Sequence, residues 1–159
     1  MLITLICVGK LKEDYWRAAQ REYAKRLRIY SRLEVVEVPE AICRDERKPH
    51  FIQMAIREEG ERILPLLKKM DLAIALDRWG KLLDSEGWAR YLAGEAAAGR
   101  SRIGLAIGGS YGLAPEVLAS SRLVWSFSPL TFPHQLMRVM VLEQIYRGFK
   151  IINREAYHK

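Results

Sequence analysis

Five short apolar runs of the kind that form β-strands recur along the chain, and segments with helical periodicity lie between them. Strands that alternate with helices are typical of a parallel sheet covered by helices. The alternation therefore predicts an α/β fold with a parallel sheet flanked by helices. The runs are residues 2–8, 33–38, 72–76, 103–107 and 123–127.

The segments between these runs predict helices from the spacing of their apolar residues. In the first of them, Trp16, Tyr23 and Leu27 recur at helical spacings. A helix that begins after Pro49 should be kinked or ended by Pro65, because proline lacks an amide donor. The other expected helices cover about residues 14–30, 85–98 and 133–152.

The length of 159 residues is that of one domain, and no repeat, linker or change in composition marks a boundary. We therefore expect a single domain over residues 1–159. No stretch approaches the roughly 18 consecutive apolar residues of a membrane span, and the first residues lack the basic start of a signal peptide. We expect a cytoplasmic protein without membrane contact, in which Cys7 and Cys43 are free thiols.

Basic residues outnumber acidic ones and give a net charge of +7, which suits a polyanionic partner. Residues 100–159 contain eight Lys and Arg against three Asp and Glu, so most of the excess lies there. The first predicted helix also carries a basic stripe, for which a solvated surface and contact with RNA phosphates are equally acceptable interpretations. The stripe consists of Arg17, Arg21, Lys25 and Arg28.

The last predicted helix has apolar residues on more than one face. Leu136, Val139, Leu142 and Phe149 are examples. Such a helix is either buried within its domain or packed against a second copy, so we expect a homodimer.

Three segments that contain glycine or proline each follow a predicted strand, at residues 76–81, 107–113 and 126–134. Because ligands bind at the carboxyl edge of open parallel sheets, we expect the three to form one pocket. Gly108 and its neighbouring glycines permit close backbone approach to an adenosine, although a tight turn would also explain them.

The spacing of residues argues against several common sites. The glycines are not followed by the Lys-Ser/Thr of a phosphate-binding loop, and no GxGxxG follows the first strand. The three histidines and two cysteines lack zinc-ligand spacing, so no metal is expected. The segment around Ser110 lacks the frame of a hydrolase nucleophile elbow.

Polar residues along and after the last helix remain as candidates for chemistry. They are His134, Arg138, Arg147, Tyr157 and His158. A simpler interpretation also accounts for them: His134 caps the helix, the two arginines pair with Glu143, and the last residues form a frayed end.

Residues 105–113 and 126–147, followed by Tyr157 and His158, together resemble the RlmH family, the large-subunit ribosomal RNA pseudouridine N3-methyltransferases. The resemblance extends over the whole chain and includes residues 8–12. It implies a SPOUT fold in which the C-terminal segment threads a loop to form a trefoil knot. It also implies S-adenosylmethionine as cofactor, and homodimers with the cofactor site at the subunit interface.

The resemblance further implies the roles of individual residues. His134, Arg147, Tyr157 and His158 belong to the RNA and catalytic side, the last two reaching across the dimer. Arg154 stands where the family usually has glycine, so the geometry of the tail can differ. The implied cofactor contacts are Leu76, Gly108, Phe127, Ser128, Pro129, Leu130, Thr131 and Phe132.

The expected reaction is methylation of ring N3 of a pseudouridine in 23S ribosomal RNA, within the assembled ribosome. Because N3 carries a proton, we take His158 as base or relay and Arg147 as the group that orients the RNA and stabilises negative charge. Two alternatives stay open: a SPOUT methyltransferase for a different RNA, and a ribosome-binding factor without catalysis.

Overall fold

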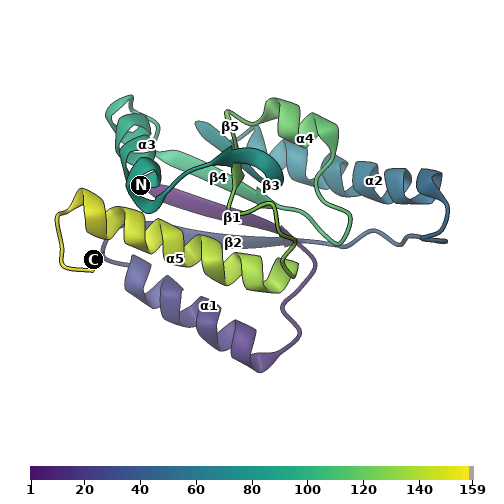
Figure 1. Ribbon diagram of the computed structural model, residues 1–159, viewed down its shortest axis with the longest axis horizontal. Coiled ribbons are helices and arrows are strands. Elements are labelled where there is room, and N and C mark those ends of the chain that lie inside the picture. Colours follow the sequence, from purple (N-terminus) through teal and green to yellow (C-terminus); the bar gives the residue numbers. More distant parts are fainter. Residues whose placement is uncertain (158–159) are drawn as a thin grey trace.

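A parallel sheet of five strands forms the centre of the protein, and the computed structural model describes residues 1–157 (Figure 1). The predicted alternation of strands and helices is confirmed. The strands are β1 (Leu2–Val8), β2 (Arg32–Val38), β3 (Leu72–Leu82), β4 (Arg102–Ile107) and β5 (Leu123–Ser126). The helices are α1 (Asp14–Leu27), α2 (Pro49–Leu67), α3 (Ser85–Ala97), α4 (Pro115–Ser120) and α5 (His134–Ile152).

The strands lie in the order β2-β1-β4-β3-β5, and every neighbouring pair is parallel. At the centre, Leu5 of β1 lies opposite Val35 of β2 and Leu105 of β4. Because all five strands point the same way, their carboxyl ends meet at one edge of the sheet, which is where ligands bind in folds of this class.

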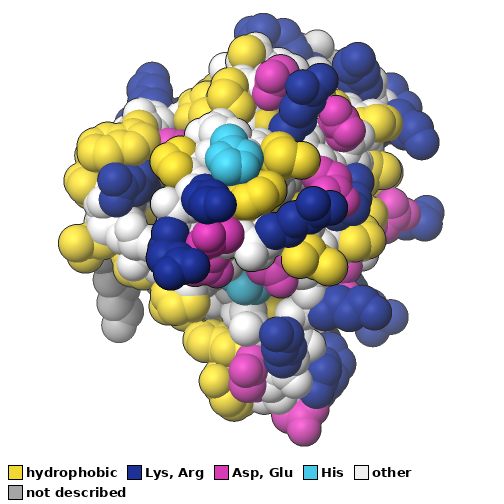
Figure 2. Space-filling model, turned by 90° about the vertical axis from the view of Figure 1, so that its right-hand side faces the viewer, with side chains coloured by type: hydrophobic (Ala, Val, Ile, Leu, Met, Phe, Trp, Pro, Cys, Tyr) yellow, Lys and Arg dark blue, Asp and Glu magenta, His cyan; other side chains and the backbone are white. Residues whose placement is uncertain are grey.

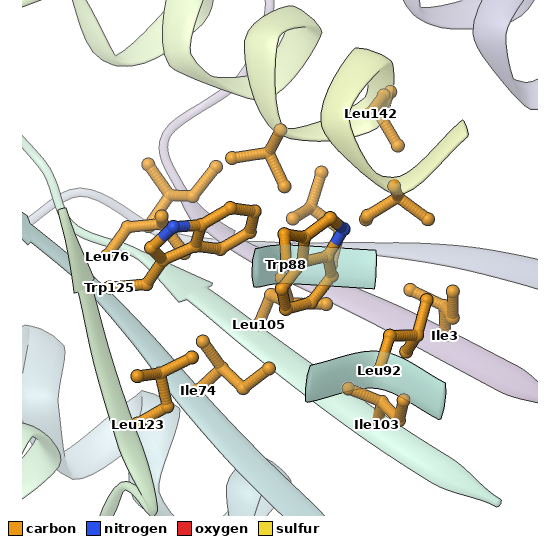
Figure 3. Close-up of a cluster of buried hydrophobic side chains, with 14 of the residues drawn as sticks. Ile3, Ile74, Leu76, Trp88, Leu92, Ile103, Leu105, Leu123, Trp125 and Leu142 are labelled. Atoms are coloured by element: carbon orange, nitrogen blue, oxygen red, sulfur yellow. The ribbon is translucent and has the colours of Figure 1, made fainter. Parts of the chain in front are cut away.

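Helices cover both faces of the sheet (Figure 1). One face packs against α1, α3 and α5, and the other against α2 and α4. Successive residues of a strand alternate between the two cores: Leu5 belongs to the first, and Ile6 belongs to the second. In the first core Trp88 of α3 stacks on Trp125 of β5 with ring centroids 4.1 Å apart (Figure 3).

Some boundaries differ from those that the sequence predicts. The first helix ends at Leu27 instead of residue 30, and residues 28–30 form a turn. Pro65 lies two residues before the end of α2, so the helix does end close to it. Helix α4 was not predicted, because its six residues are too few to show a helical period.

Strand β3 is longer than predicted and contains an irregularity that shapes the carboxyl edge. Its pairing with β5 shifts between Leu76 and Lys81, so the intervening residues bulge out of the regular ladder. Gly80 lies in this bulge, where an added Cβ would meet the carbonyl oxygen of Val124 at 2.5 Å. Only a residue without a side chain permits this approach of the two strands.

Helix α5 lies between α1 and α3 and buries one side against the sheet. Its other side is half-buried and includes Leu136, Val139 and Met140. Within residues 1–157, no helix has both the length and the hydropathy that crossing a bilayer requires.

Candidate functional site

Loops that follow β3, β4 and β5 surround one cavity of about 740 Å³ at the carboxyl edge of the sheet. These are the three segments that the sequence analysis placed at strand ends, and they lie together. Ser128 and Pro129 are not among the residues that line the cavity. The other six expected cofactor contacts do line it: Leu76, Gly108, Phe127, Leu130, Thr131 and Phe132.

The loop after β4 folds back on itself. Gly109 pairs with Gly112 in an isolated antiparallel bridge, and Gly112 has a φ of 86°, which favours glycine. A Cβ on Gly108 would lie 2.6 Å from the backbone carbon and oxygen of Gly112. The loop is therefore a tight turn at the cavity wall that its glycines make possible, and its contact with a ligand stays a prediction.

The segment after β5 is held by two serine side chains. The Ser126 hydroxyl donates to the carbonyl oxygen of Arg78 at 3.0 Å and so ties the segment to β3. The Ser128 hydroxyl accepts a hydrogen bond from the amide of Leu130 at 3.0 Å. Ser128 thus shapes the turn that brings Leu130 to the cavity wall, rather than lining the cavity itself.

A buried carboxylate that the sequence analysis did not single out lies beside the loop after β4. Glu59 of α2 is 3% exposed, and its Oε1 accepts a hydrogen bond from the amide of Ala41 at 3.0 Å. Its Oε2 has no hydrogen-bond partner among the described residues and would lie 3.1 Å from a Cβ on Gly109. Burial raises the pKa of this carboxyl. The signal in the sequence was its register, because Glu59 shares the apolar face of Ile56 and Ile63.

The charged segment 41–48 also reaches this loop. The Tyr111 hydroxyl donates to Glu46 at 2.7 Å, and this hydrogen bond raises the pKa of Tyr111. Because Tyr111 lines the cavity, residues 41–48 contribute to the support of its wall.

His134 lies at the start of α5 and lines the cavity. Pro133, not His134, occupies the capping position of the helix, so the interpretation of His134 as a cap is wrong. Burial lowers the pKa of His134, and the positive charge of Arg138 lowers it further. The neutral imidazole, which has one donor and one acceptor nitrogen, is therefore favoured at this position.

Arg138 does not pair with Glu143, as the simpler interpretation supposed. Its side chain is 0% exposed, and its Nη1 donates to Glu37 of β2 at 2.7 Å. Its Nη2 also donates to the carbonyl oxygen of Gly9 at 2.6 Å. Arg138 therefore fastens the first turns of α5, including the segment that carries His134, to the ends of β1 and β2.

Arg147 and Tyr157 lie together near the other end of α5. Arg147 donates to Glu143 at 2.6 Å, and the Tyr157 hydroxyl donates to the same carboxylate at 3.0 Å. The Arg147 guanidinium lies 4.7 Å from the centroid of the Tyr157 ring. The expected pairing of Arg147 with Glu143 is confirmed, whereas Tyr157 is fixed by contacts and is not a frayed end.

Among the candidate catalytic residues that the structure describes, His134 therefore does not meet Arg147 and Tyr157 within one chain. Arg147 follows His134 by thirteen residues of continuous helix, a distance of about 20 Å at 1.5 Å per residue. Arg147 and Tyr157 are absent from the lining of the cavity. His158 lies outside the described residues.

Basic side chains are spread widely over the face shown in Figure 2, where hydrophobic and acidic side chains lie among them. Such a surface attracts a polyanion without one concentrated positive patch. Within residues 1–157, no group of three or more His, Cys, Asp or Glu side chains is arranged to hold a metal ion.

Comparison with known proteins identifies both the fold and the family. A probable methylase family protein from Haemophilus influenzae Rd KW20 is similar with a TM-score of 0.61 and 14% identity, over 99% of this chain and 70% of that one. A probable methyltransferase from Bordetella pertussis Tohama I gives a TM-score of 0.59 at 12% identity, over 92% of this chain and 95% of that one. TrmJ from Z. mobilis ZM4 gives a TM-score of 0.54 at 14% identity, over 91% of this chain and 69% of that one.

These structures share the fold, at identities too low to transfer a substrate. The family itself is shown by a sequence model described as "Predicted SPOUT methyltransferase", which matches residues 1–158. The expectation of an α/β SPOUT fold is confirmed, while the narrower resemblance to the RlmH family stays a prediction. The chain thus belongs to the SPOUT methyltransferase family, whose cofactor is S-adenosylmethionine.

Proposed function

We propose that this protein methylates ring N3 of a pseudouridine in bacterial 23S ribosomal RNA, as a cytoplasmic enzyme of one domain that acts on the assembled ribosome. Membership of a family that acts on RNA supports the reaction class. The observation that carries the proposal is the convergence of three strand-end loops on one cavity, which is lined by six of the eight cofactor contacts that the resemblance to the RlmH family implies.

The cavity fits S-adenosylmethionine in size and chemistry. Its volume of about 740 Å³ lies within the usual range for small-molecule sites. Phe127 and Phe132 offer apolar surface for an adenine ring, and Gly108 leaves main-chain groups within reach. Ser128 and Pro129 would act by shaping the loop. When bound, the cofactor supplies an electrophilic methyl group.

The chain's own residues must hold the acceptor base in line with that methyl group and prepare its nitrogen. N3 of pseudouridine carries a proton at neutral pH, so a proton-accepting side chain, the general base, must remove it. We assign this role, as base or relay, to His158, next in the chain to the anchored Tyr157. Arg147 would orient the RNA and stabilise the negative charge that develops as the proton leaves. His134, neutral at the cavity wall, would contact the RNA.

A homodimer would bring the two groups of candidate residues together. The cavity lies at the start of α5, whereas Arg147 and Tyr157 lie about 20 Å along the helix. Antiparallel packing of two copies through α5 would place the tail of one beside the cavity of the other. The half-buried Leu136, Val139 and Met140 on α5 supply apolar surface for such contact. We propose this composite site, together with the trefoil knot of the fold.

The decisive experiment is transfer of radiolabelled methyl from S-adenosylmethionine to ribosomes that lack the modification, with free ribosomal RNA and separated subunits as parallel acceptors. We expect label in one pseudouridine of the large-subunit RNA, on whole ribosomes. Label in another RNA would show that the substrate is a different RNA, whereas the proposed enzyme class would stand. Ribosome binding without cofactor binding would instead show a binding factor without catalysis.

A further inference from the structure

The rim of the cavity carries an exposed tryptophan. Trp79 is 76% exposed, whereas Trp88 and Trp125 are almost completely buried in the core. Leu130, which is 68% exposed, lines the same cavity, so exposed apolar surface gathers at its rim, as it does at contact surfaces. The guanidinium of Arg78 lies over the Trp79 ring, 4.4 Å from its centroid.

The local backbone holds this pair in place. The Asp77 carboxylate accepts a hydrogen bond from the amide of Trp79 at 2.8 Å. Gly80, the next residue, packs directly against the backbone of Val124. Arg78 donates to the Thr131 hydroxyl at 3.4 Å, across the mouth of the cavity. Trp79 is therefore presented by the bulge of β3 and is not a side chain on a free loop.

The charges beside Trp79 favour a polyanion as its partner. Arg78 and Lys81 are both exposed, and among residues 1–157 neither has a carboxylate within ion-pair distance. An aromatic ring flanked by unpaired cations is the arrangement with which proteins bind single-stranded nucleic acid, because the ring stacks on a base while the cations attract phosphates. A second protein chain would be expected to present carboxylates to these cations.

The chemistry of the reaction requires such a surface. N3 lies on the Watson–Crick edge of the base, so the acceptor must be unpaired and drawn out of its stack before its nitrogen can enter the cavity. The neighbouring base then loses a stacking partner. We propose that Trp79, in contact with Arg78, stacks on the RNA base next to the methyl acceptor and thereby compensates for that loss. This inference rests on the proposed function.

The test compares Trp79→Ala and Trp79→Phe with the wild type, and Met54→Ala, an exposed apolar side chain of α2, serves as the control. The first measurement is the Kd for a short fluorescein-labelled single-stranded RNA, which needs no methyl transfer. We expect Trp79→Ala to raise this Kd about ten- to hundredfold, since stacking contributes roughly 1–3 kcal/mol per base. Trp79→Phe retains an aromatic ring, so its Kd for the RNA should rise much less. Met54→Ala should leave this Kd unchanged.

Three further measurements separate stacking from other roles. With unmodified ribosomes as acceptor, Trp79→Ala should raise the KM for the ribosome while the Kd for S-adenosylmethionine stays within about twofold of the wild type. Sedimentation of the variant should show the same oligomeric state. Unchanged Kd for RNA and unchanged KM would overturn the proposal, as would dissociation of the variant, which would identify Trp79 as a subunit contact. RNA binding that depends on Trp79, with no methyl transfer by the wild type, would refute the proposed reaction and not the stacking.

Discussion

Arg138 is completely buried, and its Nη1 lies 2.7 Å from Oε1 of Glu37, so one ion pair fastens α5 to β2. The same guanidinium donates to the carbonyl oxygen of Gly9 at 2.6 Å, so it links three elements at the carboxyl edge of the sheet. Removal of one partner from a buried pair costs more than the pair itself contributes, because the other groups lose their hydrogen bonds.

Arg138→Met should therefore lower the free energy of unfolding by about 3 kcal/mol, as measured by urea denaturation. Glu37→Gln should cost less, about 1 kcal/mol, because the amide oxygen can still accept a hydrogen bond from Arg138. Equal losses in the two variants would contradict this prediction and would show that a buried guanidinium without a counterion costs as much as loss of the whole Arg138 side chain.

Gly108→Ala should weaken cofactor binding, because its Cβ would lie 2.6 Å from the backbone of Gly112 and would force the loop after β4 to move. We expect the Kd for S-adenosylmethionine, measured by calorimetry, to rise at least about tenfold, equivalent to about 1.4 kcal/mol. Gly94→Ala is the matched control, since nothing lies within 4 Å of its Cβ in helix α3. It should leave the Kd unchanged and raise stability by roughly 0.5–1 kcal/mol. Equal Kd values for the two variants would count against this loop as part of the cofactor site.

Glu59→Gln should change how stability depends on pH. Burial raises the pKa of the Glu59 carboxyl above its ordinary value of 4.5, so the folded protein holds this proton more tightly than the unfolded chain does. The contribution to stability is therefore complete below pH 4.5 and is lost as the pH rises through the folded-state pKa. Glutamine cannot ionise and keeps an acceptor for the amide of Ala41, so the variant should gain stability relative to the wild type as the pH rises toward neutral. Denaturation curves at a series of pH values measure this, and a constant difference would contradict it.

The sequence predicted the layers of this fold because its strands are short, apolar and separated by helices of clear period. It also predicted which loops lie together, because the carboxyl ends of parallel strands share one edge. It could not predict which partner Arg138 takes: Glu143 and Glu37 are both available in the sequence, and only the packing of α5 on the ends of β1 and β2 decides between them.

The exposure of Trp79 also could not be predicted from the sequence. Trp88 and Trp125 are buried, whereas the position of Trp79 follows from a shift of register between β3 and β5 that no local sequence pattern predicts. The environment of Glu59 could be predicted only in part. Its register on the apolar face of α2 indicated burial, but its position beside Gly109 depends on how α2 packs on the sheet.

His158→Ala should slow methyl transfer without loss of cofactor affinity, because the proposed base acts on the acceptor and does not hold the donor. Single-turnover transfer to unmodified ribosomes measures the first quantity, and calorimetry with S-adenosylmethionine measures the second. A rate below the wild type by about a hundredfold or more is expected for loss of a general base. An unchanged single-turnover rate would remove His158 from the mechanism.

Mixed dimers test whether the site is shared between two chains. The cavity and the Arg147–Tyr157 cluster lie about 20 Å apart along α5, so a variant damaged at the cavity and a variant damaged at the tail should be inactive for different reasons. Gly108→Val and His158→Ala are suitable, since the first fills the loop after β4 and the second removes the proposed base.

When equal amounts are unfolded and refolded together, half of the dimers are mixed, and each mixed dimer has one site with an intact cavity and an intact tail. Transfer should then recover to about a quarter of the wild-type rate if subunits pair at random. If each site were built from a single chain, neither chain of a mixed dimer would carry a complete site, and no activity would return.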